Sequence, residues 1–525
     1  MAPAAPQARP GAGKSSYVCP PGANVVVQAS DDLELAVAAA KANDILCIHG
    51  EHRIQNTLQP KSGQRWIGIG DARISGAVKL AGFTKSGAAW VTSALPSTTP
   101  HKKLHYAGAT LCYPEAEYQD DVFIRKPGGD SQRLFRVLSL TELTQTGPLA
   151  DGLLEPSVSA GRFFFDYANG KLYLSVDPTG AEVDLAVVDV LIGQTPAPTG
   201  LVLQNLTLEK ALSVGILANN GKEYTLEDLT VRFVHNRGLY MPSGTSAAKR
   251  SVLRGSLITN NGQYGIDSTA NWLKLEGTEI SHNNIAGYRD KSGTKCTGYF
   301  AAGAVKFVKS NGAPGQPGLW LDGVDSHDNV GDGFWTDVHN RHVLVENSHF
   351  HHNERHGYFH EISCEIELRN STLNDNGKAI MTDLALQGQG LYVSDASNGN
   401  FHHNLIYGNA AGGVRLELVV GHDNMQGVAC ISPPPANATD TSNALMGNQV
   451  HDNQIYACNA YAAGADDNVA SGLATLLAPR NNTFSANQYH VADSGNHWID
   501  VTPKNAAAWA SVDKTGQVVT GCDHP

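Results

Sequence analysis

The chain has 525 residues, of which 54 are Gly and only 5 are Met; 17% of its residues are charged, and its formal net charge is -12 at pH 7. Abundant Gly with few charged residues favours short strands and frequent turns over long amphipathic helices. The acidic sequence has no basic stripe and no run of 18 apolar residues, so we expect neither a nucleic-acid partner nor a membrane partner.

The N-terminal part predicts a capped solenoid end. Residues 1–16 are rich in Pro, Ala and Gly, and we expect them to be disordered. Within residues 17–100, a helical pattern from Asp31 to Asn43 precedes short apolar runs at 45–48 and 66–69. We interpret this order as a helical cap followed by the first coils, because the end of a solenoid must cover its open strand edges.

Residues 101–198 predict a small antiparallel β insertion. Alternating runs lie at 121–125 and 162–166, and an Asn169-Gly170 turn leads into the run 172–175. Two alternating runs joined by Asn-Gly are typical of a hairpin.

A repeated phrase, an Asn four residues before a Gly that opens an apolar run, marks residues 199–420. It occurs as Asn261/Gly265, Asn283/Gly287, Asn329/Gly333, Asn353/Gly357 and Asn409/Gly413. A repeat of 22 to 24 residues is too short to bury its own apolar face, so neighbouring coils must stack. The sequence therefore predicts an all-β protein whose main part is a right-handed parallel β-helix, with C-terminal coils and a tail over residues 421–525.

Side chains after each coil-opening Gly alternate between core and solvent, because a strand has a two-residue period. The first position after Gly is apolar and should point inward; its members are Ile266, Phe334, Tyr358, Leu391 and Val414. The second position should face solvent and holds Trp335, Phe359, Tyr392 and Arg415. The fourth should also face solvent and holds Asp337, Glu361, Ser394 and Glu417.

Asp337 and Glu361 occupy one outward slot on consecutive coils. Stacked strands lie about 4.8 Å apart, so the two carboxyls should approach to roughly 5 Å, the separation used by retaining glycosidases. Like charges at this distance favour one protonated and one ionised carboxyl. Trp335 and Phe359 would offer apolar faces to a sugar ring, and Lys306 would share the slot of the acids if Ala302 opens its coil.

The histidines and cysteines carry no predicted metal site. His351-His352 and His402-His403 fall in different phases of the coil, so we expect solvated turns there, with His360 as a neighbour of Glu361. The eight cysteines are dispersed without close pairs, which indicates disulfides in a secreted, extracellular protein rather than zinc ligands.

The segments Lys306-Phe307, Gly318-Leu-Trp320, Gly333-Phe-Trp-Thr-Asp337 and Gly357-Tyr-Phe-His-Glu-Ile-Ser363 resemble a large set of secreted bacterial right-handed parallel β-helix proteins. The acids one coil apart are similar to those of the β-helix β-xylosidase family of glycoside hydrolases. That resemblance implies a retaining, cofactor-free enzyme with Asp337 as nucleophile and Glu361 as general acid/base. The residues expected to contact the carbohydrate substrate are Lys306, Trp335, Phe359, His360, Tyr392, Arg415 and Glu417.

Two other function classes fit the same surface. A polysaccharide lyase would use Lys306 as base, with the acids holding a cation such as calcium. A non-catalytic glycan-binding solenoid would use neither acid chemically. The long loops over a rigid scaffold favour an enzyme.

Overall fold

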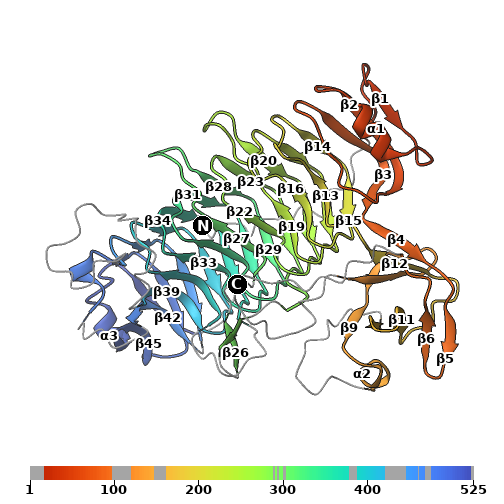
Figure 1. The fold of residues 1–525 in the computed structure, drawn as a ribbon. Coiled ribbons are helices and arrows are strands. Elements are labelled where there is room, and N and C mark those ends of the chain that lie inside the picture. Colours follow the sequence, from red (N-terminus) through yellow and green to blue (C-terminus); the bar gives the residue numbers. More distant parts are fainter. Residues whose placement is uncertain are drawn as a thin grey trace.

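The computed structural model describes residues 17–96, 120–146, 161–287, 290–292, 295–298, 303–377, 387–419, 445–458, 460–467 and 475–521. These residues form a long stack of coils, with a smaller antiparallel part beside its N-terminal end (Figure 1). Within the described ranges, no helix combines the length and the apolar character that crossing a membrane requires.

Three rows of short parallel strands make up the stack. The first row contains β14 (Val202–Gln204), β17 (Thr225–Glu227), β20 (Ser251–Arg254), β23 (Leu273–Glu276), β28 (Leu319–Asp322), β31 (Arg341–Glu346), β34 (Cys364–Arg369), β37 (Asn400–His402), β40 (Gln449–His451) and β43 (Thr483–Ser485). The second contains β15 (Thr207–Glu209), β18 (Thr230–Arg232), β21 (Leu257–Thr259), β24 (Glu279–Ser281), β29 (Asp325–His327), β32 (His349–His351), β35 (Thr372–Asn374), β38 (Leu405–Tyr407), β41 (Gln454–Ala457), β44 (Gln488–Val491) and β47 (Gln517–Thr520). These two rows belong to one 24-stranded sheet.

The third row is a separate 12-stranded sheet, and it carries both predicted acids. It contains β13 (Val190–Gly193), β16 (Val214–Leu217), β19 (Arg237–Tyr240), β22 (Ile266–Ser268), β27 (Val305–Val308), β30 (Phe334–Asp337), β33 (Tyr358–Glu361), β36 (Gln389–Ser394), β39 (Gly412–Leu418), β42 (Tyr461–Asp467), β45 (Asn496–Asp500) and β46 (Thr502–Asn505). All neighbours pair in parallel except the last two strands. A stack of parallel strands that returns to the same three rows in every coil is a parallel β-helix.

A short helix covers the first coils. Helix α1 (Leu33–Ala39) is shorter than the predicted 31–43, and it buries Leu33 and Val37 while the Asp32 side chain caps the Leu35 N–H at 3.0 Å. The first coils are β1 (Val25–Val27), β2 (Ile45–Arg53) and β3 (Arg65–Ser75), which join the 24-stranded sheet. A disulfide between Cys19 and Cys47 ties the segment before β1 to β2.

The antiparallel insertion begins earlier than predicted. Its strands are β4 (Ala77–Leu80), β5 (Thr84–Ser86), β6 (Ala89–Thr92), β7 (Val122–Arg125), β8 (Gln132–Arg133), β9 (Phe135–Val137), β10 (Arg162–Asp166), β11 (Lys171–Leu174) and β12 (Glu182–Ala186), with helix α2 (Leu140–Thr144) beside them. Because β4 pairs antiparallel with β12, the insertion starts near residue 77 rather than 101, and β13 has already rejoined the coils by Val190. The predicted hairpin at Asn169-Gly170 joins β10 to β11.

A ladder of buried asparagines holds the coils together at the corner before the 12-stranded sheet. Side-chain amides donate to the next coil at 2.9 to 3.1 Å along Asn261, Asn283, Asn329, Asn353, Asn376 and Asn409. Each also donates to a backbone carbonyl, as Asn329 does to Ile280 at 3.0 Å. The repeated Asn therefore satisfies backbone groups that a tight corner leaves unpaired.

The coils continue beyond residue 420. Strands β40 to β45 extend all three rows, and helix α3 (Ala506–Trp509) closes the C-terminal end. Its Trp509 is buried and stacks on Trp498 with ring centroids 6.2 Å apart. The boundary expected at 420 is therefore no break in the stack. A two-stranded hairpin, β25 (Asp290–Ser292) and β26 (Lys295–Gly298), lies between β24 and β27 in the chain.

Candidate active site

The structure places Asp337 and Glu361 next to each other at the ends of neighbouring strands. Strands β30 and β33 pair with Trp335 opposite Phe359 and Thr336 opposite His360, so the following residues of the two strands are also in register. At a strand spacing of about 4.8 Å the two side chains are direct neighbours. We call Asp337 and Glu361 the acid pair.

The acid pair is buried, whereas the alternation pattern suggested exposed side chains. The exposed fraction is 4% for Asp337 and 8% for Glu361. Strand periodicity gives the side of the strand to which a residue points but not what covers that side. Buried carboxyls need charged or hydrogen-bonding partners, and both have them.

Lys306 is the partner of Asp337, although not from the predicted register. Strand β27 begins at Val305, which pairs with Ile266, and Lys306 stands opposite Trp335 in the second outward column. The proposed coil opening at Ala302 is therefore wrong, and Ala302 itself lies outside the described residues. The long side chain still reaches diagonally, placing Nζ 3.0 Å from Asp337 Oδ2 and 3.5 Å from the centroid of the Trp335 ring.

The two oxygens of Asp337 differ. Oδ2 takes part in the ion pair with Lys306, whereas Oδ1 is buried and accepts no hydrogen bond from any described residue. Buried polar atoms without a partner are rare in folded proteins and often mark a functional position. An oxygen held in place with unused lone pairs is suited to nucleophilic attack.

Glu361 receives a hydrogen bond along the same diagonal direction. The indole Nε1 of Trp335 donates to Glu361 Oε2 at 3.1 Å. Because Trp335 is itself packed under Lys306, its ring fixes the position of the Glu361 carboxyl.

The second outward column forms a packed aromatic stack rather than open ring faces. Trp335, Phe359 and Tyr392 form one buried cluster with centroid distances of 5.2 and 4.9 Å. Arg355 lies 5.2 Å from the Phe359 centroid, and the His356 ring stacks on Tyr392 at 4.4 Å. The prediction that Trp335 and Phe359 are exposed is thus wrong, because successive rings and cations cover one another.

Arg415 and Glu417 stand further along the two columns, opposite Tyr392 and Ser394. The Tyr392 hydroxyl donates to Glu417 Oε2, and Arg415 forms ion pairs with Glu417 at 3.1 Å and with Asp466 at 2.8 Å. Burial and the neighbouring Glu417 raise the pKa of Asp466, while Arg415 acts in the opposite direction. The two predicted residues therefore form their own ion-pair group, two strands beyond Glu361.

His360 points into the core and is no neighbour of the Glu361 carboxyl. It occupies the inward third position, where its Nδ1 lies 2.8 Å from Thr336 Oγ1. Burial lowers the pKa of His360 to about 3. Its predicted role beside Glu361 fails because adjacent residues of a strand face opposite sides.

Asp332, Arg355 and His356, which lie just before the coil-opening glycines, were not predicted as site residues from the sequence. Arg355 Nη1 lies 2.7 Å from Asp332 Oδ2, and the side chain of Asp332 is fully buried. Burial raises the pKa of Asp332 against the opposing charges of Arg355 and Lys306, and burial with Arg355 and Arg415 lowers that of His356. The sequence signal that could have identified them is their position as polar residues directly before Gly333 and Gly357.

A second constellation of the same composition lies on the first row of the 24-stranded sheet. Lys274 Nζ lies 3.1 Å from Asp322 Oδ2 and 4.1 Å from the Trp320 ring, and Trp320 Nε1 donates to Glu346 at 2.9 Å. Asp322 and Glu346 are paired in register on β28 and β31. Composition alone therefore does not distinguish the acid pair.

Environment does distinguish the two constellations. The Asp322 side chain is 28% exposed, and its Oδ1 accepts a hydrogen bond from Asn347 at 3.1 Å. Asp337 is 6% exposed with a buried, unpartnered oxygen. The second constellation thus resembles ordinary surface pairing and offers a matched control.

Histidines stand on strands rather than only in turns. His351 ends β32 and stacks on His327 of β29 at 4.7 Å, while His402 of β37 stacks on His451 of β40 at 4.9 Å. The prediction of solvated turns is wrong for these residues, although His351 and His402 do fall in different rows. Among the described residues, the single group with converging metal-ligand atoms is Asp325, His327 and His351, away from the acid pair.

The comparisons with known proteins identify the fold. A family model described as "Right handed beta helix region" matches residues 214–419, while no curated protein matches in sequence. The solved structure of XylC with xylose aligns with a TM-score of 0.62 at 11% identity, covering 94% of this chain and 83% of XylC.

Two further solved structures have lower TM-scores. One described as a glycoside hydrolase gives 0.47 at 10% identity, over 70% of this chain and 88% of its own. The A-module of mannuronan C-5 epimerase AlgE6 from Azotobacter vinelandii also gives 0.47, at 12% identity over 96% and 97%. With its parallel rows of 24 and 12 strands, the chain is a right-handed parallel β-helix protein, as its sequence predicted.

Proposed function

We propose that the protein is a carbohydrate-active enzyme, a retaining glycoside hydrolase in which Asp337 is the nucleophile and Glu361 the general acid/base. The observation that carries the proposal is the buried acid pair, in which Asp337 is neutralised by Lys306 and keeps one oxygen to which no described residue donates a hydrogen bond. The fold likeness to XylC, which was solved with xylose, agrees with a sugar substrate.

The charges of the site fit two different roles for the two acids. The Lys306 ammonium balances one carboxylate, and a second buried negative charge would be costly. A proton on Glu361 leaves the group neutral overall, so Glu361 starts as the acid and Asp337 as the ionised partner.

The reaction then proceeds in two displacements. Asp337 Oδ1 attacks the anomeric carbon while the bond to the leaving oxygen breaks, and Glu361 gives its proton to that oxygen. Glu361, now a carboxylate, takes a proton from water, and the water oxygen displaces Asp337 from the anomeric carbon. The anomeric configuration is retained because two inversions occur.

The small exposed fractions of the acid pair favour action on the end of a sugar chain. A groove that binds the middle of a polysaccharide would leave its catalytic carboxyls open along the groove, whereas Asp337 and Glu361 are 4% and 8% exposed. An enzyme that acts on the chain end needs to admit only one terminal sugar to the two carboxyls.

The lyase alternative has less support. Its base would be Lys306, but an ammonium 3.0 Å from the Asp337 carboxylate is a poor proton acceptor. The described residues also bring no third carboxylate or imidazole into position for a cation beside the acid pair.

We further propose an extracellular or periplasmic location. Disulfides persist in oxidising compartments. Cys19 and Cys47 are bonded to each other, and Cys364 and Cys458 are also disulfide-bonded.

The test is a screen of plant and microbial oligo- and polysaccharides, followed by variants. Asp337→Asn and Glu361→Gln should each abolish turnover without unfolding the coils, and NMR should show the first product with the anomeric configuration of the substrate. Asp322→Asn and Glu346→Gln are the matched controls on the other sheet and should leave turnover unchanged. Unsaturated products that absorb ultraviolet light would refute the hydrolase, and glycan binding without turnover that survives loss of both acids would indicate a binding protein.

A further inference from the structure

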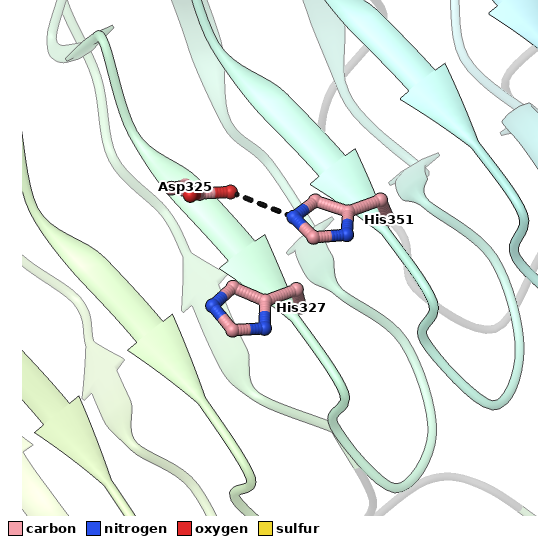
Figure 2. Close-up of side chains that lie close together, drawn as sticks. All are labelled: Asp325, His327 and His351. Atoms are coloured by element: carbon pink, nitrogen blue, oxygen red, sulfur yellow. Dashed lines mark hydrogen bonds and ion pairs between the residues drawn. The ribbon is translucent and has the colours of Figure 1, made fainter. Parts of the chain in front are cut away.

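Two histidines and one aspartate gather on the second row of the 24-stranded sheet, away from the acid pair. Asp325 and His327 lie on β29 and His351 lies on the neighbouring β32 (Figure 2). The His327 and His351 rings extend side by side from neighbouring strands, with the Asp325 carboxylate near both (Figure 2), and one ligand atom of each residue lies within 4.8 Å of the other two. Each is partly exposed, with side-chain fractions of 20%, 17% and 17%, so an ion could enter from solvent.

His327 already has the second-nitrogen contact of a metal-bound histidine, whereas the Nδ1 of His351 lies 2.7 Å from the Nδ1 of His352. His351 Nε2 lies 3.0 Å from Asp325 Oδ1, which is the contact drawn in Figure 2. His327 Nδ1 lies 2.7 Å from Asp328 Oδ2, leaving Nε2 on the inner side, where Glu279 Oε1 is 3.4 Å away. Metal-binding histidines commonly hold a carboxylate with their second ring nitrogen, because this fixes the tautomer and the ring orientation.

We propose that Asp325, His327 and His351 bind a divalent transition-metal ion that prefers imidazole ligands, with Zn²⁺ as the leading candidate. Zinc takes His nitrogens and carboxylate oxygens at about 2.0 to 2.2 Å in a tetrahedral arrangement, which places neighbouring ligand atoms roughly 3.3 Å apart. The Asp325–His351 contact meets this spacing without movement. The His327 and His351 rings stack with centroids 4.7 Å apart and planes inclined by 12°, so both rings must turn for their nitrogens to share one ion.

The ion would link coils rather than carry out sugar chemistry. Its ligands come from two successive coils, Glu279 on the preceding coil flanks the open position, and the acid pair belongs to the other sheet. A ligand that binds only the folded chain raises its stability by mass action. The metal would thus act as a clamp across the middle of the stack.

A proton competes with the ion at His327. Burial lowers the pKa of His327, but hydrogen bonds to Glu279 and Asp328 and the charges of Asp325 and Asp328 raise it to about 9 overall. The metal must displace this proton on binding. Binding is therefore best measured in a weakly coordinating buffer near pH 8.

The experiment uses the full-length protein without an affinity tag, freed of metal with a chelator. Titration calorimetry with Zn²⁺ should show one site, and Co²⁺ should give the visible absorption of a tetrahedral complex. His327→Ala and His351→Ala should each weaken binding by at least about tenfold, and Asp328→Asn, which keeps all three ligands, by about tenfold. Added Zn²⁺ should raise the melting temperature of the wild-type protein and not that of the ligand variants.

His402→Ala is the matched control. His402 also stacks on a histidine of the next coil and lies 3.2 Å from a carboxylate, that of Glu367, yet no third ligand atom from the described part of the chain converges there. It should bind Zn²⁺ as the wild type does. Equal losses in His402→Ala and His327→Ala, undiminished binding in folded ligand variants, or a wild type that binds neither Zn²⁺ nor Co²⁺ would each overturn the proposal. None of these measurements depends on sugar turnover.

Discussion

Replacing Lys306 by Met should strongly lower kcat/KM at neutral pH. The Lys306 ammonium lies 3.0 Å from Asp337 Oδ2, and both side chains are less than a tenth exposed. At an effective dielectric constant of ~20, two unit charges at this distance attract by about 5.5 kcal/mol. Removing one partner of a buried pair typically costs about 3 to 5 kcal/mol, because the other charge stays buried without compensation.

In Lys306→Met, this free-energy cost destabilises the ionised form of the nucleophile, Asp337. A penalty of about 3 kcal/mol corresponds to about two pH units, so the acidic limb of the profile of kcat/KM against pH should move up by about two units. At the pH optimum of the wild type, Lys306→Met should lose about a hundredfold in kcat/KM and recover part of it in alkaline buffer. The assay is initial rates across pH on the best sugar from the substrate screen, with circular dichroism to verify the fold.

Lys306→Arg separates this role from that of a catalytic base. Arginine keeps the positive charge but cannot act as a base, so a hydrolase should retain most of the wild-type pH profile, whereas a lyase that deprotonates its substrate with Lys306 should lose activity in both variants. Lys274→Met removes the matching lysine of the second constellation and should leave the pH profile unchanged. An acidic limb of Lys306→Met that coincides with that of the wild type would refute the reasoning.

Three further outcomes are expected. Trp335→Phe keeps the stacked ring but removes the donor 3.1 Å from Glu361. This bond becomes charge-assisted, and worth about 1.5 to 3 kcal/mol, as Glu361 gives up its proton, so kcat should fall about tenfold or more with little change in KM. An unchanged kcat would contradict this. Asn329→Ala removes the hydrogen bonds to Ile280 and Asn353 at 3.0 and 2.9 Å inside the ladder. Urea denaturation should show that the free energy of unfolding falls by about 3 kcal/mol or more. A decrease below about 1 kcal/mol would show that the ladder does not stabilise the fold. Burial lowers the pKa of His360 to about 3, so as the pH falls below about 6.5 the unfolded chain binds a proton at this residue before the folded chain does. The free energy of unfolding should therefore decrease between about pH 6.5 and pH 3, by at most about 1.4 kcal/mol per pH unit. His360→Met should flatten this slope, and an equal slope in both proteins would refute the prediction.

The repeated Asn-to-Gly phrase predicted the fold because it has a physical cause in every coil. Asn329 and Asn353 sit at the same corner and bond to each other, so their spacing to Gly333 and Gly357 is fixed. Counting four residues from each Gly therefore placed Asp337 and Glu361 in one slot.

The predicted register of Lys306 was wrong because a loop replaces the Asn-to-Gly phrase before its strand. Between Asn283 and β27 the chain makes a long excursion, and Ala304 rather than a glycine stands before the strand, so no marker fixes the phase of Lys306. The histidine group was missed for a related reason. Asp325, His327 and His351 lie on the second row, which the glycine phrase does not mark, and only strand pairing brings them together.

Burial of the acid pair follows from how the two outward columns are filled. From β27 to β39, each donor in the second column reaches the acid of the next strand in the fourth column: Lys306 to Asp337, Trp335 to Glu361, Tyr392 to Glu417, and Arg415 to Asp466. Within the run from β27 to β39, β33 carries Phe359, which is no donor, in this column, and the strand after it carries Ser394 instead of an acid. A buried acid is tolerated only where the preceding coil supplies its partner. A buried carboxyl in the fourth position should therefore be accompanied by a donor in the second position of the coil before it, and we call this relation the diagonal rule. Asp337 meets the rule, and its Oδ1 still receives no hydrogen bond from any residue in the described ranges, which is the property that a nucleophile requires.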